Sequence, residues 1–305
     1  MTVDGQKTFR HLSEILEIAQ DQTSKKLVVA AAEDLHVLQA VLYAQTENII
    51  NPILIGDSDK ILELCRENEL GPVDIPLIDE KDPKKCCELA IDLIRQGEAS
   101  ILMKGMVSTA PLLKAVLDKD KGLRKNELLS HVALFEVPSY HKLIAVTDAA
   151  MNVQPNLEEK AGIIENAVEM FHRIGIQEPK VGILGPIETV NPKIPSTVDA
   201  RDLKEMNLSG RIKGCLVYGP LAMDNAISRE AALLKGISSP VAGDADILLS
   251  PDLNSGNILY KTLIFFANSI SAAVVMGASA PIVLTSRADS EKSKLMSIAL
   301  AAALG

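Results

Sequence analysis

The pair Ser286–Arg287 has the residue types and the position that favour binding of a phosphoryl group. It ends a predicted strand that begins at residue 281, and it precedes a predicted helix that Asp289 or Ser290 can cap. The guanidinium group brings planar donors and a fixed charge to a place where the first N–H groups of the helix also attract anions. Alternatively, Asp289 only caps the helix and Arg287 pairs with a surface carboxylate. The residues themselves leave both interpretations open.

A second strand-to-helix junction lies at Lys104 and Gly105, where an apolar run ends. A helix is predicted to begin near Ser108 and Thr109, with Pro111 in its first turn, where the missing N–H group costs nothing. A lysine, a small loop and free backbone N–H groups can together bind an anion. Taken alone, however, the segment favours ordinary helix capping beside a solvated Lys104.

The acidic residues of the segment 239–261 raise the question of a metal site. Asp244, Asp246 and Asp252 lack the spacing of an EF-hand loop, so turn and helix-cap roles are predicted for most of them. Asn257 ends a short polar run that opens a predicted helix, so this run could also bind an anion. No metal is expected.

The histidines and cysteines form no recognisable catalytic pattern. His131 begins a predicted strand, where a lone histidine favours a hydrogen-bonded structural role. Cys86 and Cys87 lie in a predicted helix with no base nearby, which favours packing. The 4 cysteines show no CxxC spacing, so disulfides and structural zinc are not expected and a reducing cytosol fits.

The elements that must position these residues alternate between short β-branched runs and amphipathic helical stretches. This alternation predicts an α/β protein with mainly parallel sheets covered by helices. The predicted strands are 26–31, 49–55, 73–78, 100–103, 132–137, 143–146, 181–184, 215–218, 247–249, 272–275 and 282–285. Helices are predicted at 34–44, 83–96, 157–174 and 225–234, and left-handed glycine caps at Gly97, Gly175 and Gly236.

Composition and motifs exclude several classes of function. The 305 residues carry a formal net charge of −9, which argues against a nucleic-acid partner, because such proteins need a basic face. No phosphate loop GxxxxGK[ST] is present, and the first predicted strand runs into AAEDL rather than GxGxxG, so nucleotide hydrolysis and standard Rossmann hydride transfer lose support. The N-terminal residues lack the apolar run of a signal peptide, and no apolar window is long enough for a membrane span.

Seven ordered blocks carry a resemblance to a known family. They are MKGMVSTAPLLKAVL, LLSHVALFEV, TDAAMNVQP, NPKIPSTVDARDL, GRIKGCLVYGPLAMDNAIS, SPVAGDADILLSPDLNSGNILYK and GASAPIVLTSRADS. From about residue 25 to its end, the chain resembles the phosphate acetyl/butyryltransferase family, and its butyryl-type branch in particular.

The resemblance implies a two-domain α/β fold similar to isocitrate and isopropylmalate dehydrogenases, with the active site in an interdomain cleft. The first domain is expected to comprise 1–145 plus 281–305, and the second 146–280. The implied reaction exchanges coenzyme A (CoA) for phosphate on a short acyl group, with butyryl-CoA as the expected substrate and no metal or bound cofactor. A cytoplasmic homo-oligomer, a dimer or a multiple of dimers, is expected, with small-molecule substrates and neither nucleic acid nor membrane as partner.

The resemblance also implies roles for particular residues. It places Ser286 and Arg287 at the CoA thiol and the transferring phosphate. Acetyl-type relatives have an acidic residue, the proposed general base, where this chain has Ser293, so Asp289 and Glu291 become the candidate bases, with Asp289 preferred. The candidate residues for binding substrate or CoA are Lys104, Gly105, Ser108, Thr109, His131, Asp148, Asn152, Asp224, Asn257, Lys261, Thr285 and Ser290.

Three alternatives remain open at this point. The first is a phosphate acetyltransferase. The second is a metal-dependent decarboxylating dehydrogenase of the same fold, which needs a cluster of carboxylates and arginines around a divalent metal. The third is a regulator that binds CoA without turnover.

Overall fold

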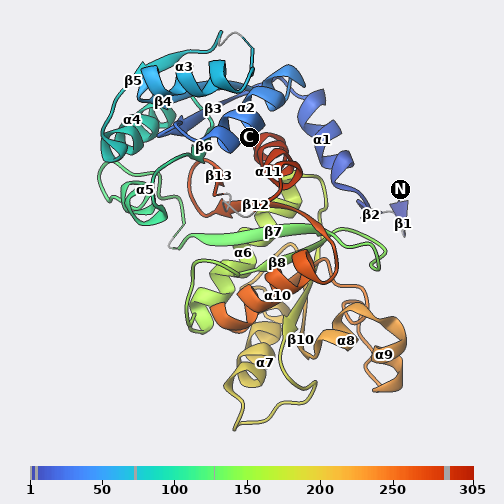
Figure 1. Cartoon of the computed structure of the whole chain (residues 1–305). Helices are drawn as coiled ribbons and strands as arrows, with labels where there is room; N and C mark the ends of the chain where they lie inside the picture. Colours follow the sequence, from blue (N-terminus) through green and yellow to red (C-terminus); the bar gives the residue numbers. More distant parts are fainter. Residues whose placement is uncertain (1, 4–5, 72–73, 127, 285–288) are drawn as a thin grey trace. The chain divides into compact units, whose positions relative to one another are not determined.

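The computed structural model describes the whole chain except residues 1, 4–5, 72–73, 127 and 285–288. The chain divides into two compact units. Unit 1 comprises Met1–Leu12 and Leu128–Ser271, and unit 2 comprises Ser13–Glu127 and Ala272–Gly305. In Figure 1 the blue, cyan and red segments belong mainly to unit 2, and the green to orange segments mainly to unit 1.

Unit 2 is built on a sheet whose strands follow the order β12-β13-β6-β3-β4-β5. All neighbours pair in parallel except β12 and β13, which pair antiparallel. Buried aliphatic residues dominate these strands except β5, as expected for a sheet covered on both faces. The strands are β3 (Lys25–Ala30), β4 (Ile50–Gly56), β5 (Leu77–Asp79), β6 (Ile101–Lys104), β12 (Ile270–Met276) and β13 (Ile282–Val283).

The helices of unit 2 lie on both faces of this sheet. They are α1 (Leu12–Asp21), α2 (Leu35–Thr46), α3 (Ser58–Glu67), α4 (Pro83–Arg95), α5 (Thr109–Val116) and α11 (Glu291–Leu304). The β3–α2–β4 and β5–α4–β6 crossovers run in opposite directions along the sheet, so right-handed connections put α2 and α4 on opposite faces. Helix α11 packs beside α2, as Figure 1 also shows, and α5 packs beside α4. The chain therefore leaves the neighbouring strands β13 and β6 toward opposite faces.

Unit 1 contains a second group of strands in the order β10-β9-β11-β8-β7. Only β7 and β8 pair antiparallel in this group. The strands are β7 (Ser130–Glu136), β8 (Ile144–Thr147), β9 (Lys180–Leu184), β10 (Leu216–Leu221) and β11 (Ile247–Leu249), with a small hairpin of β1 (Thr2–Val3) and β2 (Gln6–Lys7). Its helices are α6 (Leu157–Arg173), α7 (Pro195–Leu208), α8 (Met223–Ile227), α9 (Arg229–Leu234) and α10 (Leu253–Phe265).

The elements confirm the predicted α/β class with mainly parallel strands. The three glycine caps are also confirmed, since Gly97, Gly175 and Gly236 have φ values of 76°, 98° and 67°. The single helix predicted over 225–234 is wrong. Ser228 is extended, with φ −119° and ψ 117°, and its hydroxyl accepts from Ala231 N, so it separates α8 from α9 as an N-cap.

The two compact units do not share their boundaries with the domains expected from the sequence. Strand β8 pairs with β7 and with β11, so residues 128–145 join unit 1 rather than the N-terminal part. The expected division into 1–145 plus 281–305 and 146–280 stays a prediction. Among the described residues, no helix is both long and apolar enough to cross a membrane.

Candidate active site

Two loops with candidate site residues leave unit 2's sheet at the same edge. Strands β6 and β13 pair in parallel, with Leu102 opposite Ile282 and Met103 opposite Val283. The segments that begin at residues 104 and 284 therefore start side by side at the carboxyl ends of neighbouring strands. Because the chain continues to opposite faces from these two strands, this is the kind of position where α/β sheets bind ligands.

Lys104 and Gly105 shape the loop after β6. The ammonium group of Lys104 donates to the carbonyl oxygens of Gly105 at 3.1 Å and Val107 at 3.2 Å, so it is bound to its own loop rather than simply solvated. A Cβ atom on Gly105 would lie 1.9 Å from the carbonyl oxygen of Ala31, so only glycine fits there. The loop is thus held close to the end of β3.

The N-terminus of α5 is available at the end of this loop. Ser108 occupies the N-cap position with extended backbone, but its hydroxyl makes no capping hydrogen bond. Ser108 and Thr109 are both exposed, and Pro111 lies in the first turn as predicted. The first N–H groups of the helix can therefore receive an anionic oxygen.

The segment before α11 is described from Asp289 onward. Thr285, Ser286 and Arg287 lie outside the described residues, so their predicted roles stay predictions. The helix is capped by Ser290, whose hydroxyl accepts from Ser293 N at 3.1 Å. Ser290, and not Asp289, is therefore the N-cap of α11. The capping role that was the alternative to catalysis for Asp289 belongs to Ser290.

In unit 1, Asp148 organises the turn after β8. Its carboxylate accepts from the backbone N–H groups of Ala150, Met151 and Asn152 at 2.8, 3.1 and 3.3 Å, and from the Asn152 amide at 2.6 Å. The Asn152 amide also donates to Leu129 O at 3.0 Å. Asp148 as a residue is only 3% exposed, and with four donors around its carboxylate it fixes the loop.

Helix α10 brings the next group of candidates against this turn. A Cβ on Gly256 would lie 2.3 Å from Asp148 O, and Asn257 donates its side-chain amide to Ala149 O at 3.1 Å. Further along the helix, the Tyr260 ring contacts His131 edge-on at 5.9 Å, and the ammonium group of Lys261 lies 5.4 Å from the same ring. The structure therefore brings five candidates together in unit 1: His131, Asp148, Asn152, Asn257 and Lys261.

Asp224 belongs to a different group within unit 1. Its side chain is 54% exposed and pairs with Lys235 at 3.1 Å. The hydrogen bond from Lys235 and the N–H of Asn225 lower the pKa of the Asp224 carboxyl. It is therefore ionised at neutral pH and already has a cation partner.

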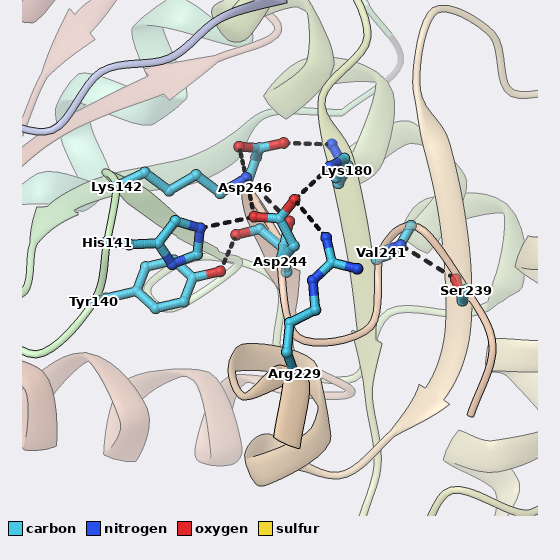
Figure 2. Close-up of polar contacts among 10 residues, drawn as sticks. Tyr140, His141, Lys142, Lys180, Arg229, Ser239, Val241, Asp244 and Asp246 are labelled. Carbon is cyan, nitrogen blue, oxygen red and sulfur yellow. Dashed lines mark hydrogen bonds and ion pairs between the residues drawn. The ribbon is translucent and has the colours of Figure 1, made fainter. Parts of the chain in front are cut away.

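The acidic segment 239–261 contains a helix cap and an ion cluster. Asp252 caps α10 by accepting from Ser255 N at 2.8 Å, which confirms the cap role. Asp244 instead pairs with His141 at 2.8 Å, Lys142 at 3.2 Å, Arg229 at 3.7 Å and Lys180, and Asp246 pairs with Lys142 at 2.5 Å (Figure 2). These six residues are called the Asp244 cluster below.

The Asp244 cluster joins the amino ends of three strands. Lys180 begins β9, while Lys142 and Asp246 stand just before β8 and β11. Burial alone raises the pKa of Asp244, but the hydrogen bond from Lys180 and the charge of Lys142 outweigh it and lower the pKa to about 2. The cluster lies at the edge of these strands opposite to their carboxyl ends, so it stabilises the fold.

Thiol and metal chemistry find no support among the described residues. All 4 cysteines are buried and free. Burial raises the pKa of Cys86 and Cys87 to about 11 and of Cys215 to about 12, so these thiols stay protonated at neutral pH. In the part of the chain that the structure describes, no three His, Cys, Asp or Glu side chains are grouped to hold a metal ion.

Sequence reasoning missed the lysine at position 294, which is only 4% exposed beside the candidate loop. No periodic pattern of apolar residues indicated this burial, because nearly every residue of α11 from Ser293 onward is buried.

The chain superposes on a putative 4-hydroxythreonine-4-phosphate dehydrogenase from Salmonella typhimurium with a TM-score of 0.59 and 16% identity, covering 93% of this chain and 100% of that one. This likeness concerns the fold alone, and it confirms the expected dehydrogenase-like α/β fold.

Sequence comparison then gives the family. The chain belongs to the phosphate acetyl/butaryl transferase family, whose model matches residues 80–302. It is 46% identical over 293 residues to a phosphate butyryltransferase of Clostridium beijerinckii, which is 96% of this chain and 97% of that protein. A branched-chain phosphotransacylase from Enterococcus faecalis V583 superposes with a TM-score of 0.79 at 33% identity, over 92% and 99% of the two chains. The resemblance seen in the sequence is confirmed.

Proposed function

We propose that this chain is a phosphate acyltransferase that exchanges CoA for phosphate on a short acyl group: acyl-CoA + phosphate ⇌ acyl phosphate + CoA. The single observation that carries the proposal is the pairing of β6 with β13, which starts the two anion-binding candidate loops side by side in a chain of this family. The substrates are acyl-CoA, phosphate, acyl phosphate and CoA. Metal and bound cofactor have no part in the proposed reaction.

In the proposed mechanism, Arg287 binds the phosphate and the N-terminus of α5 stabilises the oxyanion. Arg287 binds the phosphate whose oxygen attacks the acyl carbonyl carbon, because its planar fork can hold two phosphate oxygens. The tetrahedral intermediate carries an oxyanion, which the free N–H groups at the start of α5 stabilise. The attacking hydrogen phosphate passes its proton to the Asp289 carboxylate, and the CoA thiolate takes that proton from Asp289 as its bond to the acyl carbon breaks, with Ser286 orienting the sulfur atom. In the reverse direction Asp289 removes that proton, because the thiolate is the nucleophile.

The preferred acyl group has about four carbons. This part of the proposal is supported by the relatives of the butyryl type and by the TSRADS ending of the last block. Each buried CH₂ contributes roughly 0.8 kcal/mol, so a fitted pocket separates neighbouring chain lengths by several-fold in kcat/KM.

The decisive experiment is thiol release from acetyl-, propionyl-, butyryl- and isobutyryl-CoA in the presence of phosphate. Phosphate-dependent release with butyryl-CoA or isobutyryl-CoA ahead of acetyl-CoA is expected. A higher kcat/KM for acetyl-CoA contradicts the chain-length proposal and assigns the chain to phosphate acetyltransferases. CoA binding without acyl-phosphate formation contradicts the enzyme proposal and favours a regulator.

We also propose that the enzyme works in the cytoplasm as a homo-oligomer, a dimer or a multiple of dimers. The free and buried cysteines support a reducing compartment. Mass measurement in solution by light scattering tests the oligomer, and a monomer at micromolar concentration contradicts it.

A further inference from the structure

Lys294 is a buried cation in the second turn of α11. Its relative exposure is 4%, and Ser293 before it and Met296 after it are buried as well. An ammonium group that is removed from water needs a partner, because the loss of its hydration is unfavourable. Its surroundings in the protein therefore decide what this lysine does.

The other two buried lysines of the described chain show how such a charge is usually balanced. Lys142 pairs with Asp246 at 2.5 Å, and Lys160 pairs with Asp199 at 2.5 Å. Lys294 differs from both. Its ammonium group donates to the carbonyl oxygen of Asp289 at 2.6 Å, and none of the ion pairs among the described residues includes it. One of its three N–H donors is used, and its charge has no described counterion.

The free end of Lys294 lies at the N-terminus of α11. Side chains on a helix lean toward the N-terminus, and the bond to Asp289 O shows that this one reaches back past the N-cap Ser290. The helix is 14 residues long, so its N-terminus carries the positive end of a full dipole. The N–H group of Glu291, its first residue, has no acceptor within the helix. Two independent sources of positive potential therefore converge on one place.

We propose that Lys294, together with the N–H group of Glu291, binds a phosphate group of a substrate. The inference rests on the proposed function, because it assigns a further binding residue to the same reaction. A phosphate group suits the site since it accepts from several donors at once and balances a buried cation. It can come from two sources, the transferring phosphate or the phosphates of CoA, and the test below separates them.

The test compares Lys294→Met with Lys292→Met in the full-length protein. Lys292 lies on the same helix, two residues earlier, and is exposed, so its variant removes the same charge without emptying a buried site. Lys294→Met is expected to raise one KM by about tenfold to a hundredfold, the scale of a lost charge-assisted hydrogen bond. A rise in the KM for phosphate identifies the transferring phosphate, and a rise in the KM for butyryl-CoA identifies CoA. Lys292→Met should change neither by more than about twofold.

A second readout does not depend on turnover. Inorganic phosphate or CoA should raise the Tm of the wild type and of Lys292→Met in a concentration-dependent way. The same ligand should leave the Tm of Lys294→Met almost unchanged. Lys294→Arg keeps the charge and should recover part of the ligand-induced shift in Tm. It therefore tests the phosphate site if Lys294→Met folds poorly.

Two results overturn the inference. One is a Lys294→Met protein that keeps both KM values within about twofold of wild type and the full ligand-induced shift, which assigns to Lys294 only a structural bond to Asp289. The other is a wild-type protein that neither phosphate nor CoA stabilises. A wild type without turnover but with a shift that depends on Lys294 contradicts the proposed function and leaves the phosphate site in place.

Discussion

The Asp244 cluster and the N-terminus of α11 are both charged regions next to strands, and they differ in how their charges are balanced. In the cluster, two carboxylates are surrounded by four basic side chains at distances up to 3.7 Å. At α11, the buried ammonium group of Lys294 donates to a carbonyl oxygen and takes part in none of the ion pairs among the described residues. The charges of the Asp244 cluster are balanced without a ligand. The ammonium group of Lys294, in contrast, has N–H donors that can bind one.

Their places in the sheets agree with this difference. The cluster joins the amino ends of β8, β9 and β11, whereas α11 follows β13 at a carboxyl edge. Ligands bind at carboxyl edges because the loops there lead into helix N-termini. A shifted pKa by itself therefore marks a well-paired structural charge in this protein, and an unbalanced charge at the right edge is the better sign of a binding site.

Among the variants of the segment that leads into α11, Arg287→Lys should have the largest effect on catalysis. A lysine keeps the charge but not the two-oxygen fork, so kcat/KM for phosphate should fall roughly 10²- to 10³-fold, as on removal of an oxyanion donor. Arg201→Lys, on an exposed arginine that pairs with Asp202 at 2.8 Å, is the control and should leave kinetics unchanged. Steady-state kinetics with varied phosphate measures both. Wild-type turnover in Arg287→Lys contradicts the assignment of the phosphate site.

Asp289→Ser should have the next largest effect. Since Ser290 caps α11, loss of the Asp289 carboxylate should leave the Tm near that of wild type. As the proposed base, its loss should lower kcat by about 10²-fold at neutral pH, and less at higher pH, where the CoA thiolate forms unaided. Asp59→Ser, on the exposed side of α3, is the control. An unchanged kcat in Asp289→Ser leaves Glu291, or an unassisted thiol held by Ser286, as the alternatives.

Asp244→Asn tests the other side of the comparison and should act on stability rather than on catalysis. The folded pKa of about 2 lies about two units below the ordinary aspartate value, which corresponds to roughly 3 kcal/mol without screening. Because the cluster is partly exposed to solvent, ionised Asp244 should contribute about 2 kcal/mol to the free energy of unfolding at neutral pH. Urea unfolding should show this loss in Asp244→Asn, with KM for phosphate unchanged. Asp202→Asn is the control, because its surface ion pair should contribute under about 1 kcal/mol.

The difference in unfolding free energy between wild type and Asp244→Asn should depend on pH with a defined sign. The folded pKa of Asp244 is depressed, so its contribution is fully present above the unfolded pKa of about 3.9 and disappears as pH falls through about 2. The stability difference between wild type and Asp244→Asn should therefore be constant from pH 7 to about pH 5 and shrink toward zero near pH 2. A difference that persists at pH 2 assigns the effect to packing instead of charge.

Much of the fold was predictable because its signals are local. The β-branched runs became strands, although of the described residues in the run predicted at 73–78 only Leu77 and Ile78 lie in a strand. Gly97, Gly175 and Gly236 have the left-handed conformation that ends helices. The break between α8 and α9 was not predicted, because Ser228 can stand inside a helix as well as cap one. In such cases the tertiary packing decides between two locally acceptable structures.

The candidate site was predictable as a set of loops but not as a set of contacts. The spacing indicated that Lys104 and Gly105 end a strand next to a helix, which the structure confirms. No local pattern indicates that His141, Lys180 and Arg229 meet at Asp244, since they are separated by up to 103 residues from it. Whether a charged residue is paired depends on these distant neighbours, and for that reason the sequence could not separate the Asp244 cluster from a binding site.

Gly105 has a consequence for engineering of this protein. Any side chain there would have to displace the backbone of Ala31, because the clash at 1.9 Å involves a carbonyl oxygen and not a flexible side chain. A mutant library that aims at new acyl substrates should therefore keep Gly105 and vary Met106, which is 51% exposed in the same loop. Screening effort at position 105 would be spent on misfolded loops, while position 106 offers a rigidly held place for diversification.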